Sequence, residues 1–94
     1  MALTTKQKQQ LKARAHSLKP VVLMGDNGLT PAVQKEINRA LTDHELIKVR
    51  MHVEDRALKK AVFQEMCDAQ HAELIQIIGN IGVLFREKPQ QKGA

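Results

Sequence analysis

The chain has 94 residues, 43% of them hydrophobic, and a formal net charge of +5 at pH 7. This length suits a single domain with one modest core, and we expect residues 1–87 to form it and residues 88–94 to be a polar, flexible tail. The absence of a long apolar run or secretory leader and the single cysteine argue against membrane spanning, secretion and internal disulfides, and predict a reducing, cytoplasmic setting.

The positive charge is concentrated in the first 20 residues. This stretch has no acidic residue and five basic ones: Lys6, Lys8, Lys12, Arg14 and Lys19. In the rest of the chain, ten basic and ten acidic residues balance. Such an uneven distribution points to a polyanion partner such as nucleic acid or a membrane surface. The alternative is a solvated helix face that binds nothing.

The first predicted helix begins after Thr4 and runs to about Ser17. Thr4 and Gln7 have the spacing of a capping box, in which each side chain satisfies the other's backbone amide. Pro20 forces the residue before it into an extended conformation and so ends the helix. A narrow apolar stripe is expected to dock the helix and to leave its basic side chains in solvent: Leu11, Ala15 and Leu18.

A short buried strand is predicted at residues 20–24, before the turn Gly25-Asp26-Asn27-Gly28 and a second helix that ends near Asp43. Thr30 suits the N-cap of this helix, and Pro31 suits its first turn. The amides of such a turn and of a helix start can hold an anion. An ordinary strand-to-helix turn is the alternative. Asp26 sets a negative charge at the loop tip, so it either points away from an anion or weakens its binding.

This loop has the form G-x-x-G, which is a weak pattern because residues 79–82 match it too. The second copy lies in a predicted hairpin, where its glycines serve the turn and the strand start. The first copy lacks the Gly-Lys-Ser/Thr ending of a nucleoside triphosphate loop and the longer dinucleotide fingerprint. A nucleic-acid phosphate is therefore the anion that the loop suits best.

Residues 45–53 alternate strictly, which predicts a strand with one buried and one wet face. The wet face carries Lys48, Arg50 and His52, and Arg86 at the end of the last strand could join them. This basic stripe either binds a polyanion or keeps the sheet soluble.

A third helix is predicted from the Asp55 cap to about Gln70, with its inner stripe formed by Leu58, Val62, Met66 and Ala69. Phe63 and Cys67 form a second pair beside it, and we interpret Cys67 as a buried hydrophobe. Strands at residues 73–78 and 81–86 form a hairpin around Gly79-Asn80. The expected fold is α/β, in the order α-β-α-β-α-β-β, with a four-stranded mixed sheet. Its two crossovers predict parallel strand pairs.

Catalysis and metal binding have little support in the sequence. The four histidines lack ligand spacing, and no nucleophile motif or carboxylate pair stands out, so we expect no enzyme, metal or cofactor. The two aromatic residues, Phe63 and Phe85, occupy core-like positions. Base stacking on aromatic platforms is therefore not expected, and we expect the protein to contact the backbone and shape of a nucleic acid rather than to read unpaired bases.

Several blocks of sequence resemble the CRM domain family in its bacterial stand-alone form, often called YhbY. The resemblance covers nearly the whole chain and rests on residues 18–22, 25–30, 44–49, 78–80 and 83–86. It implies a fold similar to the C-terminal domain of translation initiation factor three and an RNA-binding module linked to large ribosomal subunit assembly. The family's G-x-x-G loop is compared with that of KH domains, and RNA contact carries over to Gly25, Asn27, Gly28 and the first helix.

The leading hypothesis is thus a monomeric, cytoplasmic protein that binds large-subunit ribosomal RNA or its precursor particle. A loop-bound phosphate flanked by the basic residues of the first helix is expected. The predicted contacts are Lys8, Lys12, Arg14, Lys19, Gly25, Asp26, Asn27, Gly28, Thr30, Lys48, Arg50 and Arg86. One alternative is a module that docks an assembly factor or ribosomal protein through the first helix, and another is a small enzyme with an unrecognised site.

Overall fold

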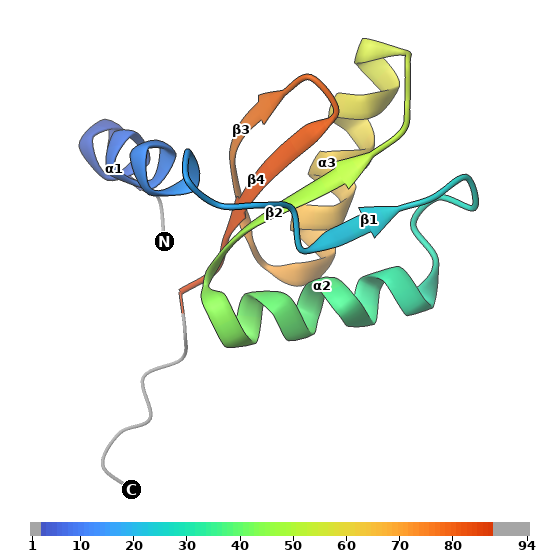
Figure 1. Ribbon diagram of the computed structural model, residues 1–94, viewed down its shortest axis with the longest axis horizontal. Coiled ribbons are helices and arrows are strands. Elements are labelled where there is room, and N and C mark those ends of the chain that lie inside the picture. The colour runs from blue at the N-terminus through green and yellow to red at the C-terminus, as the bar shows by residue number, and fades with distance from the viewer. Residues whose placement is uncertain (1–2, 88–94) are drawn as a thin grey trace, which may run out of the picture.

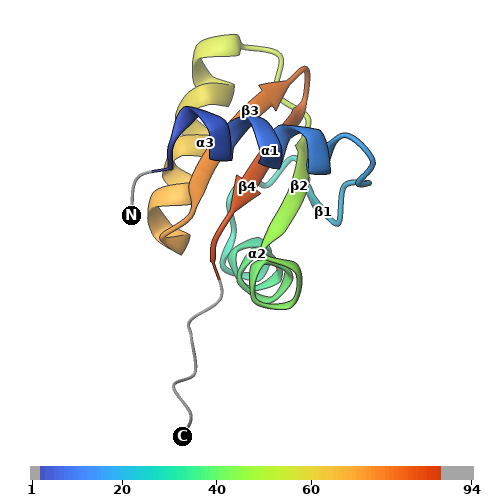
Figure 2. The same cartoon turned by 90° about the vertical axis from the view of Figure 1, so that its left-hand side faces the viewer.

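The protein is a small α/β domain of three helices and a four-stranded mixed sheet, seen in a computed structural model that describes residues 3–87 (Figure 1). The elements follow in the predicted order: α1 (Thr5–Ala15), β1 (Val22–Met24), α2 (Pro31–His44), β2 (Leu46–Met51), α3 (Arg56–Gln70), β3 (Glu73–Ile78) and β4 (Ile81–Phe85). α2 and α3 cover one sheet face, and α1 crosses the other (Figure 2). The expected tail at residues 88–94 lies outside the described residues.

All three predicted helix starts are confirmed by their caps. The side-chain oxygens of Thr4, Thr30 and Asp55 accept hydrogen bonds from the backbone amides three residues on, at 3.1, 3.2 and 3.0 Å. The first of these is a complete capping box. Each cap satisfies an amide that would otherwise have no partner in the first helical turn. α1 ends at Ala15, two residues before the predicted end.

The strands lie in the order β1-β2-β4-β3. β1 and β2 are parallel, as expected for a strand–helix–strand crossover, and the final hairpin is antiparallel. The prediction of a second parallel pair is wrong, because β4 lies between β2 and β3 and pairs antiparallel with both. The second strand of the hairpin, β4, therefore lies next to β2, and β3 forms the edge of the sheet.

Two apolar clusters hold the layers together, one on each face of the sheet. The larger lies under α2 and α3 and contains Ile37, Leu41, Val49 and Met51 among its fully buried members. The smaller lies under α1 and consists of Leu11, Ala15, Leu46, Ile75 and Val83. The prediction of a wet face on β2 is therefore wrong near its start. α1 docks there by two apolar side chains, and its other faces stay in solvent.

The inner face of α3 also differs from the prediction. Its buried side chains are Phe63, Met66, Cys67 and Gln70, whereas Leu58 is 53% exposed. Phe63 packs over Gly82 of β4, where an added Cβ would lie 2.6 Å from the ring's Cδ1 atom. The ring fills the space that the missing side chain leaves, which sets the rotation of α3. Gly82 therefore serves packing, and Gly79, with φ +57, serves the hairpin turn.

Arg86 joins the two large helices rather than the basic stripe on β2. Its guanidinium donates to the carbonyl oxygens of Gln70 (3.1 Å) and Asn38 (3.0 Å) and to the Thr42 hydroxyl (2.9 Å). Gln70 in turn donates to Gln34 of α2. The expectation that Arg86 extends the basic strand face is wrong, because its donors bridge α2 and α3 on the other side of the sheet.

Cys67 is buried, as predicted, and burial raises the pKa of its thiol from 9.0 to about 12, with the Asp68 and Glu73 carboxylates adding to the shift. Between these values the unfolded chain loses the thiol proton and the folded chain keeps it. The free energy of unfolding should therefore fall as the pH rises from about 9 to about 12. Denaturant titrations across this window should give Cys67→Ala a weaker pH dependence than the wild type, and equal dependence would contradict this account.

Candidate nucleic-acid interface

Six of the predicted basic residues lie on α1, on the segment after it, and on β2. They are Lys8, Lys12, Arg14, Lys19, Lys48 and Arg50. Four are exposed, and Lys8 and Lys48 are half-buried. Within residues 3–87 the ion pair found is Arg39–Asp43 on α2, so no described carboxylate neutralises the six cations. Their charge remains available for an anionic ligand.

Lys48 ties the segment that follows α1 to the sheet. Its Nζ donates to the Leu18 carbonyl oxygen at 2.9 Å, and its own carbonyl accepts from the Val21 amide at 3.0 Å. An ammonium group has three donors, so two remain for a ligand. The segment between α1 and β1 is thereby fixed with Lys19 exposed at its surface.

Two grooves flank the C-terminal end of α1. A groove of about 560 Å³ is lined on its basic side by Lys12, His16 and Lys48. Another of about 320 Å³ is lined by Arg14, Lys19 and His44 together with apolar residues. No acidic residue lines either groove. The C-terminal end of a helix carries partial negative charge, which favours this gathering of basic side chains.

The two histidines of these grooves were not singled out by the sequence. His16 lies one helical turn after Lys12, which is the signal that could have placed it beside that lysine. His44 ends α2 and is brought to the groove only by the fold. No local pattern predicts that position.

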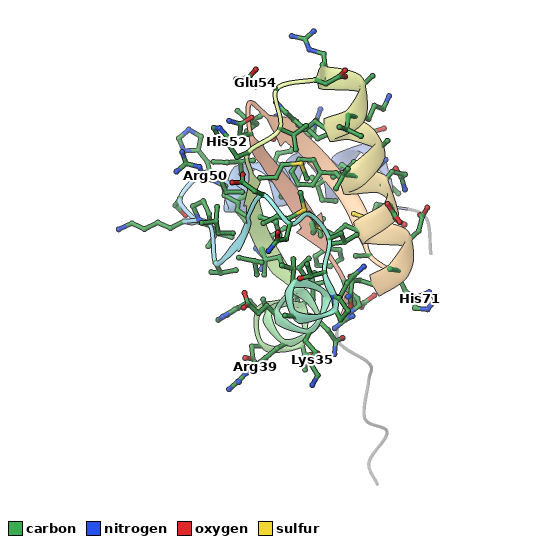
Figure 3. The ribbon with its side chains drawn as sticks, turned by 90° about the vertical axis from the view of Figure 1, so that its right-hand side faces the viewer. Lys35, Arg39, Arg50, His52, Glu54 and His71 are labelled. Carbon is green, nitrogen blue, oxygen red and sulfur yellow. The ribbon has the colours of Figure 1, made fainter. Side chains whose placement is uncertain are left out.

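Arg50 lies beyond the part of the sheet that α1 covers. It is in register with Leu23 of β1 on one side and Ile81 of β4 on the other. Leu23 is 64% exposed, so this row gives the surface both charge and apolar area. Figure 3 shows Arg50 and His52 near each other, apart from Lys35 and Arg39 on α2.

The loop at residues 25–28 forms a hydrogen-bonded turn. The Gly28 amide donates to the Gly25 carbonyl at 3.1 Å, and the Thr30 amide donates to the Gly28 carbonyl at 3.0 Å. The amides of Asp26, Asn27 and Leu29 have no acceptor among the described residues. Two of the backbone amides around the loop are therefore used within the turn, and three remain able to donate to an anion.

The loop and α1 lie far apart. Figure 1 places α1 at one end of the molecule and the loop between β1 and α2 at the other. The extended chain between them, residues 19–24, spans roughly 20 Å at about 3.3 Å per residue. The expectation that the basic residues of α1 flank a phosphate held by the loop is wrong. A ligand that meets both must be long.

Two other kinds of site are absent from residues 3–87. No group of three or more His, Cys, Asp or Glu side chains there is arranged to hold a metal ion. No helix of this part of the chain has the length and apolarity needed to cross a membrane.

The chain is similar to proteins of known family. The family model of the CRS1/YhbY (CRM) domain matches residues 3–86. A Haemophilus influenzae protein named RNA-binding protein is 47% identical over 90 residues, which cover 96% of this chain and 91% of the relative. A probable RNA-binding protein of Pseudomonas aeruginosa is 43% identical over 90 residues, covering 96% and 86% of the two chains.

A solved structure shares the fold. The solution structure of a Staphylococcus aureus protein suggested to bind RNA superposes with a TM-score of 0.84 at 34% sequence identity. It covers 97% of this chain and 95% of its own. The similarity therefore extends over almost all of both molecules.

Proposed function

Because the chain belongs to the CRS1/YhbY (CRM) domain family, we propose that it is a cytoplasmic RNA-binding protein that contacts structured ribosomal RNA during large-subunit assembly. The names of its relatives describe RNA-binding proteins rather than enzymes. The observation that carries the proposal is the surface around the end of α1, where two grooves are lined by basic side chains and by no acidic ones.

Binding through this surface rests on phosphate contacts. Lysine acts on a phosphate as a point charge with three donors, and arginine can present two parallel donors to it. Such contacts position a protein on a nucleic acid and supply a large share of its affinity. Arg86 is outside this contact set, because its guanidinium already bridges α2 and α3.

The loop at residues 25–28 is proposed as a second contact on the same RNA. Its separation from α1 suits a structured RNA long enough to reach both, and the open amides of Asn27 and Leu29 suit a phosphate oxygen. Asp26 is exposed at the tip of the loop, and because its negative charge repels a phosphate, its carboxylate is proposed to point away from the bound RNA. Thr30 holds the helix start in position through its cap.

Substitution of the two loop glycines distinguishes an effect on protein stability from an effect on RNA binding. Gly28 has φ +76, so Gly28→Ala should destabilise the protein by about 1–2 kcal/mol. A Cβ at Gly25 meets no atom within 4 Å, so Gly25→Ala should leave stability unchanged and weaken RNA binding by crowding the approaching backbone. Thermal denaturation and RNA titration check both. Wild-type affinity in Gly25→Ala would remove this part of the loop from the interface.

The RNA partner is tested by crosslinking in cells followed by sequencing of the attached RNA. Reads should concentrate in large-subunit ribosomal RNA or its precursor. An even spread over unrelated RNAs, or enrichment of small-subunit RNA, would contradict the assigned role in large-subunit assembly.

A protein-interaction module is the second candidate, because apolar side chains after α1 are exposed beside the smaller groove. Leu18 is 38% and Val21 52% exposed. A ribosomal protein or assembly factor docked there would be retained when Lys8, Lys12 and Lys19 are replaced together by Gln, whereas RNA binding would be lost. Co-purification and RNA titration of this variant distinguish the two candidates.

A further inference from the structure

The larger groove lies between the last turn of α1 and the sheet face that α1 only partly covers. One wall is formed by α1 and the turn after it, through Lys12, Ala13, Ala15, His16 and Ser17. The strands supply Lys48, Gln76, Ile78 and Val83. At about 560 Å³ it falls within the 300–1,000 Å³ typical of pockets that hold small molecules. A single organic group of nucleotide size is therefore a suitable occupant.

Strand register places the sheet residues of the groove in two rows. Lys48, Val83 and Gln76 are partners across β2, β4 and β3. The next row contains Ile78, paired with Ile81. A bulge at Ile75 shifts the register of β3, so Gln76 and Ile78 face α1 instead of α2 and α3. The bulge thus delivers an amide and an apolar side chain to the groove.

These side chains offer three kinds of contact at one place. Ile78 is 54% exposed and gives an apolar floor, and the fully buried Val83 closes the bottom of the groove. The Gln76 amide has no hydrogen-bond partner among the described residues, and it can both donate and accept. Lys12, His16 and Lys48 lie at the basic side. An occupant with an apolar face, a polar edge and a negative group would satisfy all three.

We propose that this groove binds one unpaired nucleotide of the RNA. The base lies on Ile78, its edge hydrogen-bonds to Gln76, and its phosphate meets Lys12 and Lys48. The proposal rests on the proposed function and adds to it a preference for RNA with a nucleotide free to leave the helix. Paired bases cannot enter, because their edges and faces are occupied within the duplex. An aliphatic floor here replaces the aromatic platform that the chain lacks.

The test compares a fully paired RNA duplex with the same duplex carrying one bulged nucleotide. Because the groove buries and hydrogen-bonds one base, the wild type should bind the bulged RNA roughly tenfold more tightly, which corresponds to about 1.4 kcal/mol. Gln76→Ala and Ile78→Ser should each reduce this preference and leave duplex affinity unchanged. Leu58→Ser is the matched control, since Leu58 is equally exposed on α3, and it should keep the preference.

The outcomes separate this proposal from the proposed function. Equal binding of the two RNAs, or a preference kept by both groove variants, would overturn the nucleotide site while salt-dependent duplex binding still supported the proposed function. In that case an acidic protein segment would be the better candidate ligand for the groove. Failure to bind either RNA would overturn both proposals.

Discussion

RNA affinity is expected to fall on the order of 10³-fold when the salt concentration rises from about 50 to about 200 mM. Neutralising about six phosphates releases a comparable number of counterions, and the binding constant then depends steeply on salt. Six cations on α1, on the segment after it and on β2 have no ion-pair partner in the described part of the chain: Lys8, Lys12, Arg14, Lys19, Lys48 and Arg50. Titrations at several salt concentrations give the slope directly.

Replacing Lys8, Lys12 and Lys19 together by Gln should reduce the slope of log affinity against log salt by about three, one unit for each lost phosphate contact. The matched control replaces Lys35, Arg39 and Lys60 by Gln, which removes the same charge from exposed positions on α2 and α3. The control should keep nearly the wild-type slope. Equal losses in both variants would show that net charge, and not the surface around α1, determines binding.

Gly82→Ala is expected to destabilise the protein by about 1–3 kcal/mol, the usual cost of overpacking a filled core. The new methyl group would lie against the Phe63 ring, which is itself fully buried among the side chains of α3 and the sheet. Thermal denaturation should show the melting temperature lowered by roughly 4–8 °C for each kcal/mol in a domain of this size.

Phe63→Leu provides the control for this clash. The smaller side chain leaves room for the methyl group, so Gly82→Ala should cost less in the Phe63→Leu background than in the wild type. Residues in direct contact typically show such coupling, at about 0.5–3 kcal/mol. Additive effects in the double variant would contradict the close packing of Phe63 on Gly82.

Local signals in the sequence predicted most of the fold. The hydroxyl and carboxylate caps at Thr4, Thr30 and Asp55 act within one helical turn, so residue type and spacing are enough to predict them. Strict alternation likewise identified the buried face of β2, and the Gly79-Asn80 turn identified the hairpin. Each of these features depends on residues only a few positions apart, so it can be recognised from the sequence pattern.

Features that depend on distant partners were not predicted. The rotation of α3 follows from the contact of Phe63 with Gly82, and the bridge made by Arg86 needs both α2 and α3 in position. The bulge at Ile75 reverses the faces of Gln76 and Ile78 with no local composition signal. At the candidate interface, Lys12 and Arg14 of α1 were identified correctly as exposed, whereas Lys8 is half-buried, and the distance of α1 from the loop required the fold.

RNA is proposed to bind across the surface formed by α1, the segment after it and β2. The most direct test follows the backbone amide resonances of the isotope-labelled protein while a large-subunit ribosomal RNA fragment is added. Shifts should concentrate in residues 8–24 and 46–52 and in the loop at residues 25–30, while the exposed side of α2 around Lys35 and Arg39 stays unchanged. Shifts centred on α2 and α3, with α1 unaffected, would contradict the account.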